Sequence, residues 1–64
     1  MKLSETKFLL ALANKGMNTA DLARATGYSL STIRAYLNFK RNPTTKALGA
    51  MAKALECSVT DIIE

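Results

Sequence analysis

The sequence contains no histidine and no tryptophan, and it has one cysteine and one proline among its 64 residues. Without histidine, the chain cannot assemble a Ser-His-Asp or a Cys-His arrangement for nucleophilic catalysis. A single thiol also cannot supply the usual ligands of a tetrahedral zinc site. Cys57 has no second cysteine with which to form an intramolecular disulfide, which fits a reducing compartment. We therefore expect that the protein is not an enzyme and holds no metal or cofactor.

Long apolar runs are absent as well. No stretch approaches the roughly 20 residues that span a membrane, and the N-terminal residues lack the apolar segment of a signal peptide. We expect no membrane partner and a cytoplasmic protein. The chain also leaves no room for a ligand-sensing domain, so we expect no small-molecule ligand.

Negative charge is missing from the middle of the chain. The formal net charge is +4, and the stretch from Leu22 to Leu55 contains no Asp or Glu, because all five acidic residues lie outside it. The same stretch carries six basic residues: Arg24, Arg34, Lys40, Arg41, Lys46 and Lys53. A basic block between acidic ends predicts a surface that meets a polyanion on one side only.

Hydrophobic residues make up 48% of the chain, yet only two Tyr and two Phe are aromatic, which favours a helical core of Leu, Ile, Ala and Met. The length predicts one domain, residues 1–64, of the all-α class. We expect Gly49 to mark a close helix contact and Cys57 to be a small buried hydrophobe. Apolar spacing and capping residues predict five short helices: from the Ser4 cap to about Lys15, about Thr19 to Thr26, about Leu30 to Asn38, from the Thr44 cap to about Leu55, and a last one from the Ser58 cap.

The stretch from about residue 18 to residue 38 has the pattern of a helix-turn-helix. Asn18 and Asp21 form a capping-box pattern, and Ser29 can cap the next helix. Between them Gly27 can close the first helix in a left-handed conformation. Two capped helices with so little chain between them must cross steeply, and the second usually enters the major groove of DNA. That helix has two sides, one with Ile33, Tyr36 and Leu37 and the other with Ser31, Arg34, Ala35 and Asn38.

A series of short motifs follows in order along the chain: Asn18-Thr19-Ala20-Asp21-Leu22-Ala23, Gly27, Ser29-Leu30-Ser31-Thr32-Ile33, Asn42-Pro43, Met51-Ala52-Lys53-Ala54-Leu55, Val59, Asp61, Ile62 and Ile63. In order and spacing these motifs resemble the Cro and phage-repressor family, also called the XRE-type helix-turn-helix proteins. The resemblance covers residues 8–63 and implies a compact five-helix domain of the lambda-repressor-like DNA-binding type. It also implies a transcriptional regulator that binds a double-stranded DNA operator as a homodimer and is therefore associated with the prokaryotic nucleoid.

The resemblance further implies which residues contact DNA. The base-reading positions of the family fall on Leu30, Ser31, Arg34 and Ala35. Arginine favours guanine O6 and N7, serine bonds several base edges, and Leu or Ala can contact a thymine methyl group. The phosphate-contacting positions fall on Thr19, Tyr36, Asn38, Lys40, Arg41 and Asn42. Phosphate contacts set register and affinity without reading the base sequence.

Three departures from the family pattern lead to predictions. Leu12 and Leu37 stand where the family often has an Arg–Glu pair, so we predict that these leucines are buried and in contact. Phe39 stands where glycine is frequent, which predicts a different path for the basic loop that follows. Glu56 replaces a frequent glycine or asparagine in the turn before the last helix.

Two questions stay open at this point. The protein is either a sequence-specific regulator or a protein-interaction module, such as an antitoxin-type partner, with secondary or no DNA binding. The affinity for DNA phosphates would fall steeply with salt concentration, whereas the affinity of a mainly apolar protein contact would not. The dimer contact is open as well: Ile62 and Ile63 cannot both point inward, so one of them can pair across a two-fold axis, or the chain is a fragment of a longer repressor.

Overall fold

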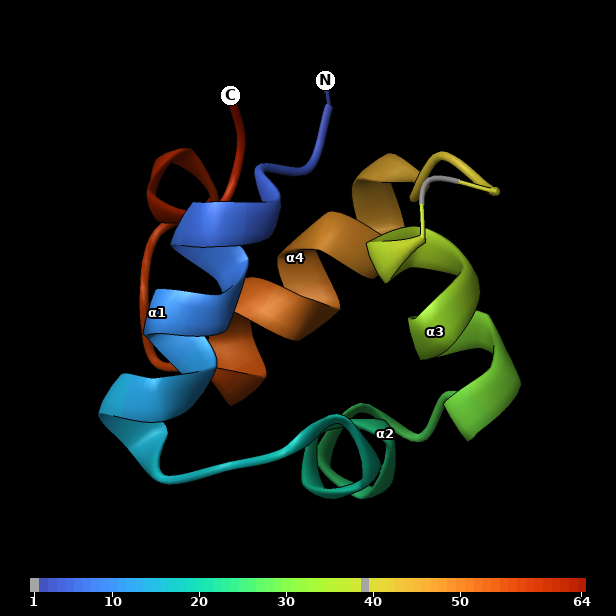
Figure 1. The fold of residues 1–64 in the computed structure, drawn as a ribbon, viewed down its shortest axis with the longest axis horizontal. Helices are drawn as coiled ribbons and strands as arrows, with labels where there is room; N and C mark the ends of the chain where they lie inside the picture. The colour runs from blue at the N-terminus through green and yellow to red at the C-terminus, as the bar shows by residue number, and fades with distance from the viewer. Residues whose placement is uncertain (1, 39) are drawn as a thin grey trace.

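The computed structural model describes residues 2–38 and 40–64. They form four α-helices, α1 (Glu5–Lys15), α2 (Thr19–Thr26), α3 (Leu30–Leu37) and α4 (Thr45–Ala54), and the 3-10 turn η1 (Val59–Asp61). Figure 1 shows α4 crossing the middle of the molecule between α1 and α3, with α2 below them. The all-α class is confirmed. The prediction of five helices is wrong, because the last element is a single 3-10 turn.

Side-chain caps begin the helices where the sequence predicts. Ser4 and Thr44 each accept a hydrogen bond from the backbone N–H three residues on, at 3.3 Å and 3.0 Å. The cap of α2 is reciprocal, since Asn18 Oδ1 accepts from the Asp21 N–H at 2.8 Å and Asp21 Oδ2 accepts from the Asn18 N–H at 3.0 Å. These bonds satisfy N–H groups that a helix start leaves without partners, which is why the boundaries are readable from sequence.

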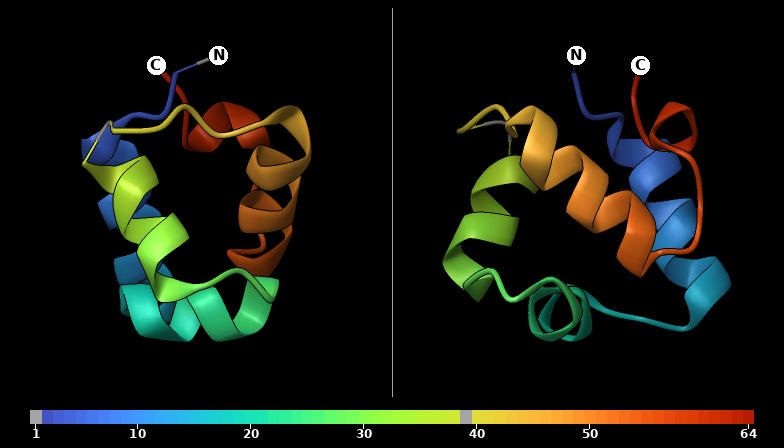
Figure 2. Two further views of the ribbon diagram at one scale, coloured as in Figure 1. Left: turned by 90° about the vertical axis from the view of Figure 1, so that its right-hand side faces the viewer. Right: turned by 180° about the vertical axis from the view of Figure 1, so that it is seen from behind.

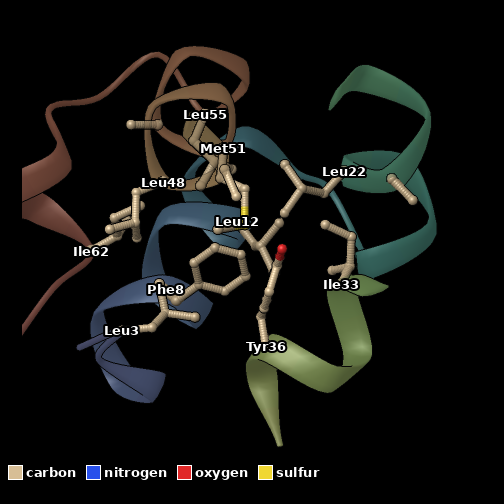
Figure 3. Packing of buried hydrophobic residues seen from close by; sticks show 13 residues of the cluster. Leu3, Phe8, Leu12, Leu22, Ile33, Tyr36, Leu48, Met51, Leu55 and Ile62 are labelled. Atoms are coloured by element: carbon tan, nitrogen blue, oxygen red, sulfur yellow. The ribbon is translucent and has the colours of Figure 1, made fainter. Parts of the chain in front are cut away.

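The core lies between α1, α4 and the α2–α3 pair (Figure 3). Burying one Leu, Ile or Phe side chain completely stabilises a fold by roughly 1.5–3 kcal/mol. On α1 the apolar stripe runs through the half-buried Ala11, while Leu9 faces outward. Of the three residues predicted on the inner side of α3, Ile33 and Tyr36 are buried and Leu37 is half-buried. The buried residues are Leu3, Phe8, Leu12, Leu22, Ala23, Ile33, Tyr36, Ala47, Leu48, Met51, Ala52, Leu55 and Ile62.

Three expectations about single residues need correction. Leu12 is buried as predicted, but Leu37, the last residue of α3, is only half-buried against the core, and direct contact between the two stays a prediction. Gly49 lies on the outer side of α4, where a Cβ would meet nothing within 4 Å, so the predicted close helix contact is wrong. Cys57 is half-buried, because the chain leaves the core just after α4 ends.

The turn after α4 keeps a left-handed residue although the sequence places Glu56 there. Its φ is 55°, its N–H donates to the Lys53 carbonyl at 3.1 Å, and the Cys57 N–H donates to the Ala52 carbonyl at 3.0 Å. This is the pattern with which helices end at glycine, and a side chain in it carries a steric cost. The Glu56 carboxylate pairs with Lys15 of α1, and this hydrogen bond and the ammonium charge lower the pKa of Glu56. Glu56, in place of the glycine or asparagine that is frequent in the family, therefore keeps the turn but adds backbone strain.

Residues near the two ends of the described chain pair with each other. Leu3 and Ile63 form an antiparallel bridge, and the Ser4 N–H donates to the Ile62 carbonyl at 2.8 Å. The chain does not continue as the predicted helix after η1, and residues 62–64 pair with residues 2–4 instead. Ile62 is buried and Ile63 is half-buried against the core. Figure 1 shows both ends at the same edge of the molecule.

Candidate nucleic-acid interface

α2 and α3 form the helix-turn-helix that the sequence predicts. Gly27 has a φ of 82°, and its N–H donates to the Ala23 carbonyl at 2.9 Å, which ends α2. Residues 27–29 then lead directly into α3. α2 contacts both α3 and α4, and both views in Figure 2 show α3 along an outer edge of the molecule. The fold therefore presents α3 to the outside and supports it with α2.

Hydroxyl groups fix the connection between the two helices. Ser29 Oγ accepts from the Thr32 N–H at 3.1 Å and lies 2.9 Å from Thr32 Oγ1. Thr26 Oγ1 donates to the Leu22 carbonyl at 2.9 Å and accepts from the Tyr28 N–H at 3.3 Å. Sequence reasoning identified the Ser29 cap but missed the Thr26 hydroxyl, whose only signal is a threonine just before the helix-closing glycine. Together these bonds set the direction in which α3 leaves the turn.

One side of α3 is held in the core and the other faces outward. Ile33 is fully buried and Tyr36 is 4% exposed. The four positions predicted to read bases lie on the outer side or at its border, with Ser31 and Arg34 exposed and Leu30 and Ala35 half-buried. Two polar side chains beside two small or apolar ones can meet both the polar base edges and the thymine methyl groups of a major groove.

A basic segment follows α3 directly. The Lys40 N–H donates to the Ala35 carbonyl at 3.0 Å, which keeps the segment against the end of α3. The side chains of Lys40, Arg41 and Asn42 are all exposed. The Arg41 guanidinium lies 5.9 Å from the centre of the Tyr36 ring, within the range of a cation–π contact. The segment therefore holds its charges close to the C-terminal end of α3.

The other predicted phosphate contacts differ in exposure. Thr19 is half-buried in the first turn of α2, and Asn38 is exposed at the end of α3. Tyr36 is buried, and Figure 3 shows its hydroxyl oxygen pointing from α3 toward the middle of the core cluster. This burial does not fit the predicted phosphate contact, so Tyr36 instead supports α3 and the Arg41 side chain. Phe39, which was predicted to divert the basic loop, lies outside the described residues.

Ion pairing leaves the outer face of α3 positively charged. Arg24 on α2 pairs with Asp21, so part of its charge is offset. Across residues 2–38 and 40–64, Arg34, Lys40 and Arg41 form no ion pair with an acidic side chain. Neither α3 nor the segment from residue 40 to 44 contains an acidic residue. An uncompensated basic surface of this kind attracts the phosphate backbone of nucleic acids.

The part of the chain that the structure describes contains no group of three or more Cys, Asp or Glu side chains placed to hold a metal ion. None of the helices in that part has the length and apolar character needed to cross a membrane.

The fold and the outer face of α3 define the chain as a helix-turn-helix DNA-binding domain. A family model for the Cro/C1-type HTH DNA-binding domain matches residues 9–64. The chain therefore belongs to the Cro/C1-type helix-turn-helix family, and the resemblance read from its motifs is confirmed. No curated protein and no solved structure matches the chain significantly.

Proposed function

We propose that the protein is a transcriptional regulator that recognises a specific operator by inserting α3 into the major groove. The observation that carries this proposal is the outer face of α3, where Ser31 and Arg34 are exposed on a helix without acidic residues. An α-helix fits the major groove, and each base pair presents a distinct pattern of donors, acceptors and methyl groups there. Membership of a DNA-binding family supports the same reading.

Each base-reading residue has a definite role in this proposal. Arg34 donates two hydrogen bonds to O6 and N7 of a guanine, the most frequent specific contact in protein–DNA complexes. Ser31 bonds a neighbouring base edge through its hydroxyl group. Leu30 and Ala35, which are half-buried at the border of the helix, contact thymine methyl groups.

Phosphate contacts flank α3 at both ends of the helix-turn-helix. Thr19 lies in the first turn of α2, where the helix dipole favours an anion. Asn38 and the exposed segment of Lys40, Arg41 and Asn42 meet the backbone beyond the other end. The bond from the Lys40 N–H to α3 and the contact of Arg41 with Tyr36 restrict where these charges can lie. Such contacts set the register of α3 in the groove.

Two copies on a two-fold symmetric operator would place their α3 helices one DNA turn, about 34 Å, apart. The described part of the chain measures 25 × 23 × 19 Å. Two copies side by side along one face of a duplex therefore have room for this spacing, and each reads one half-site.

The test is a selection of binding sites from a random duplex library at near-physiological salt. The intact protein is compared with a Ser31→Ala and Arg34→Ala double variant, which removes one positive charge from α3. Lys53→Ala serves as the matched control, since it removes one positive charge from the exposed side of α4. We expect a palindromic motif whose preferred bases change in the double variant and stay the same in the control.

Two results would contradict the proposal. The first is a motif that the double variant leaves unchanged, which would exclude α3 as the reader. The second is no motif at all, with residual binding that disappears at modest salt. The protein-interaction alternative would then be the better description of the chain.

A further inference from the structure

An open hollow of about 450 Å³ lies beside the helix-turn-helix, between α2 and the first residue of α3. The residues that line it come from α2, from the turn and from α3: Ala20, Ala23, Arg24, Gly27, Tyr28 and Leu30. Four of them are small or apolar, whereas Arg24 and Tyr28 carry hydrogen-bond donors. We call this surface the α2 hollow.

The α2 hollow adjoins the proposed DNA contacts at both of its ends. At one end Ala20 directly follows Thr19, the proposed phosphate contact in the first turn of α2. At the other end Leu30 both lines the hollow and belongs to the proposed base-reading positions. A duplex that contacts Thr19 and Leu30 together therefore faces the hollow that lies between them.

Arg24 is held at the hollow by an acidic residue of the same helix. Its Nη2 group donates to Asp21 Oδ1, while Asp21 Oδ2 accepts from the Asn18 N–H. The Arg24 side chain is still 73% exposed. An arginine has five N–H donors in a planar fork, and Arg24 makes no other hydrogen bond within residues 2–38 and 40–64. The Asp21 carboxylate thus orients the guanidinium and leaves most of its donors free.

Tyr28 is also held in place, and its hydroxyl group is available. The Tyr28 N–H donates to Thr26 Oγ1 at 3.3 Å, and the side chain is half-buried against the core. Its hydroxyl group makes no hydrogen bond with the described residues. The described part of the chain has no buried side-chain oxygen without a partner, so this hydroxyl group must reach the solvent.

The lining of the α2 hollow matches the two chemical parts of a nucleic-acid backbone. A deoxyribose ring can lie against small apolar residues, and a phosphate accepts hydrogen bonds from arginine and tyrosine side chains. We propose that the α2 hollow binds one sugar–phosphate unit of DNA, with Arg24 and Tyr28 as the hydrogen-bond donors. This inference rests on the proposed function, and it adds a contact on α2 to those at Thr19 and after α3.

The salt dependence of DNA binding tests the Arg24 contact. Arg24→Ala should weaken binding to any duplex at least about threefold and make the slope of log affinity against log salt less negative by about 1. Lys15→Ala is the matched control, because Lys15 is also paired with an acid but lies at the end of α1, across the molecule from α3 (Figure 1). Its slope should change by less than about 0.3.

A second pair of variants separates a direct contact from neutralisation of Asp21. Asp21→Asn removes the negative charge, and Arg24→Ala is then added to it. A direct phosphate contact predicts the same loss of at least about threefold in this background. If Arg24 acts only by neutralising Asp21, the added substitution changes nothing, and the proposal is wrong.

The hydroxyl group of Tyr28 is tested by Tyr28→Phe, which removes a donor but no charge. We expect a loss of about threefold in affinity with an unchanged salt slope. Unchanged affinity would remove Tyr28 from the contact.

Single neutral methylphosphonate linkages in the selected operator locate the contact. We expect one position at which the neutral linkage weakens binding of the intact protein but not of Arg24→Ala. An unchanged salt slope in Arg24→Ala, or neutral linkages whose effects never depend on Arg24, would overturn the proposal. This failure is distinct from failure of operator recognition, because the salt slope is measured with any duplex and needs no base preference.

Discussion

The face of α3 and the face of α1 rest on the same core but expose different chemistry. On α3 the exposed side chains are polar or basic, Ser31 and Arg34 among them, and no acid lies nearby in the helix. On α1 the exposed side chains include Leu9 and Leu10, beside charges of both signs. The first face suits a polyanion, whereas the second carries exposed apolar side chains. One small core thus supports two faces of different chemistry.

The largest expected effect tests whether a buried leucine and an exposed leucine contribute differently to the free energy of unfolding. Leu22 on α2 is fully buried and Leu10 on α1 is 59% exposed. We expect Leu22→Ala to lower the free energy of unfolding by about 3 kcal/mol, and Leu10→Ala to lower it by less than about 0.5 kcal/mol. Urea titration of dilute protein, followed by circular dichroism, measures both. Equal losses of unfolding free energy would mean that Leu22 and Leu10 contribute equally to stability despite their different burial.

The next effect separates the two faces by their binding. Arg34→Ala should weaken binding to the selected operator by about 2 kcal/mol, because it removes the proposed guanine contact. Its free energy of unfolding should change by less than about 0.5 kcal/mol, since the side chain is exposed. Fluorescence anisotropy with a labelled operator gives the affinity, and Leu10→Ala is the control on the other face. An unchanged affinity in Arg34→Ala would show that base reading occurs elsewhere.

The basic segment after α3 should act without base preference. We expect a Lys40→Ala and Arg41→Ala double variant to lose about tenfold in affinity for any duplex and to make the slope of log affinity against log salt less negative by about 1 for each residue. Titrations at several salt concentrations, with operator and with unrelated DNA, measure this. A loss restricted to the operator would instead assign these residues to sequence recognition.

A smaller effect concerns the support of α3 by α2. Asn18→Ala removes one half of the reciprocal cap that begins α2. The expected loss of unfolding free energy is about 1 kcal/mol. Asp21→Ala removes the other half, and its loss should not add fully to that of Asn18→Ala in the double variant, because both belong to one cap. Fully additive losses would mean that the two hydrogen bonds act independently.

The smallest effect concerns the strained turn on the α1 side. Glu56 adopts a φ of 55°, which glycine accepts without steric cost. Glu56→Gly should therefore raise the thermal midpoint of unfolding by about 2–5 °C, despite losing the exposed pair with Lys15. Glu56→Ala is the control, because it loses the same pair and keeps the strain, so its midpoint should not rise. Calorimetry of the two variants decides, and a rise in both would argue against backbone strain.

The parts of the fold that the sequence predicts correctly depend on neighbouring residues. Asn18, Gly27 and Ser29 act through hydrogen bonds or backbone angles within a few positions, so the helix-turn-helix and its bounds follow from local chemistry. The outward position of Ser31 and Arg34 follows from the helical period once the buried side is known.

The parts that the sequence misses depend on residues far apart in the chain. After η1, residues 62–64 pair with residues 2–4, almost sixty positions earlier, in place of the predicted helix. Gly49 was expected at a helix contact, but only the packing of the other helices decides which side of α4 faces outward. The hollow between α1 and the chain around η1 likewise depends on how η1 lies against α1. No sequence pattern distinguishes the exposed Leu9 and Leu10 from the buried leucines of the core.

The pairing of the chain ends has a consequence for how such a unit can be joined to other proteins. The Glu64 N–H donates to the Lys2 carbonyl at 2.9 Å, so entry and exit of the chain are about one strand spacing apart. A host loop could accept the unit as an insertion without opening further than that spacing. Both junctions would lie together at one edge, as Figure 1 shows. A host protein joined there would be connected to the inserted DNA-binding domain by two chain segments rather than by one linker.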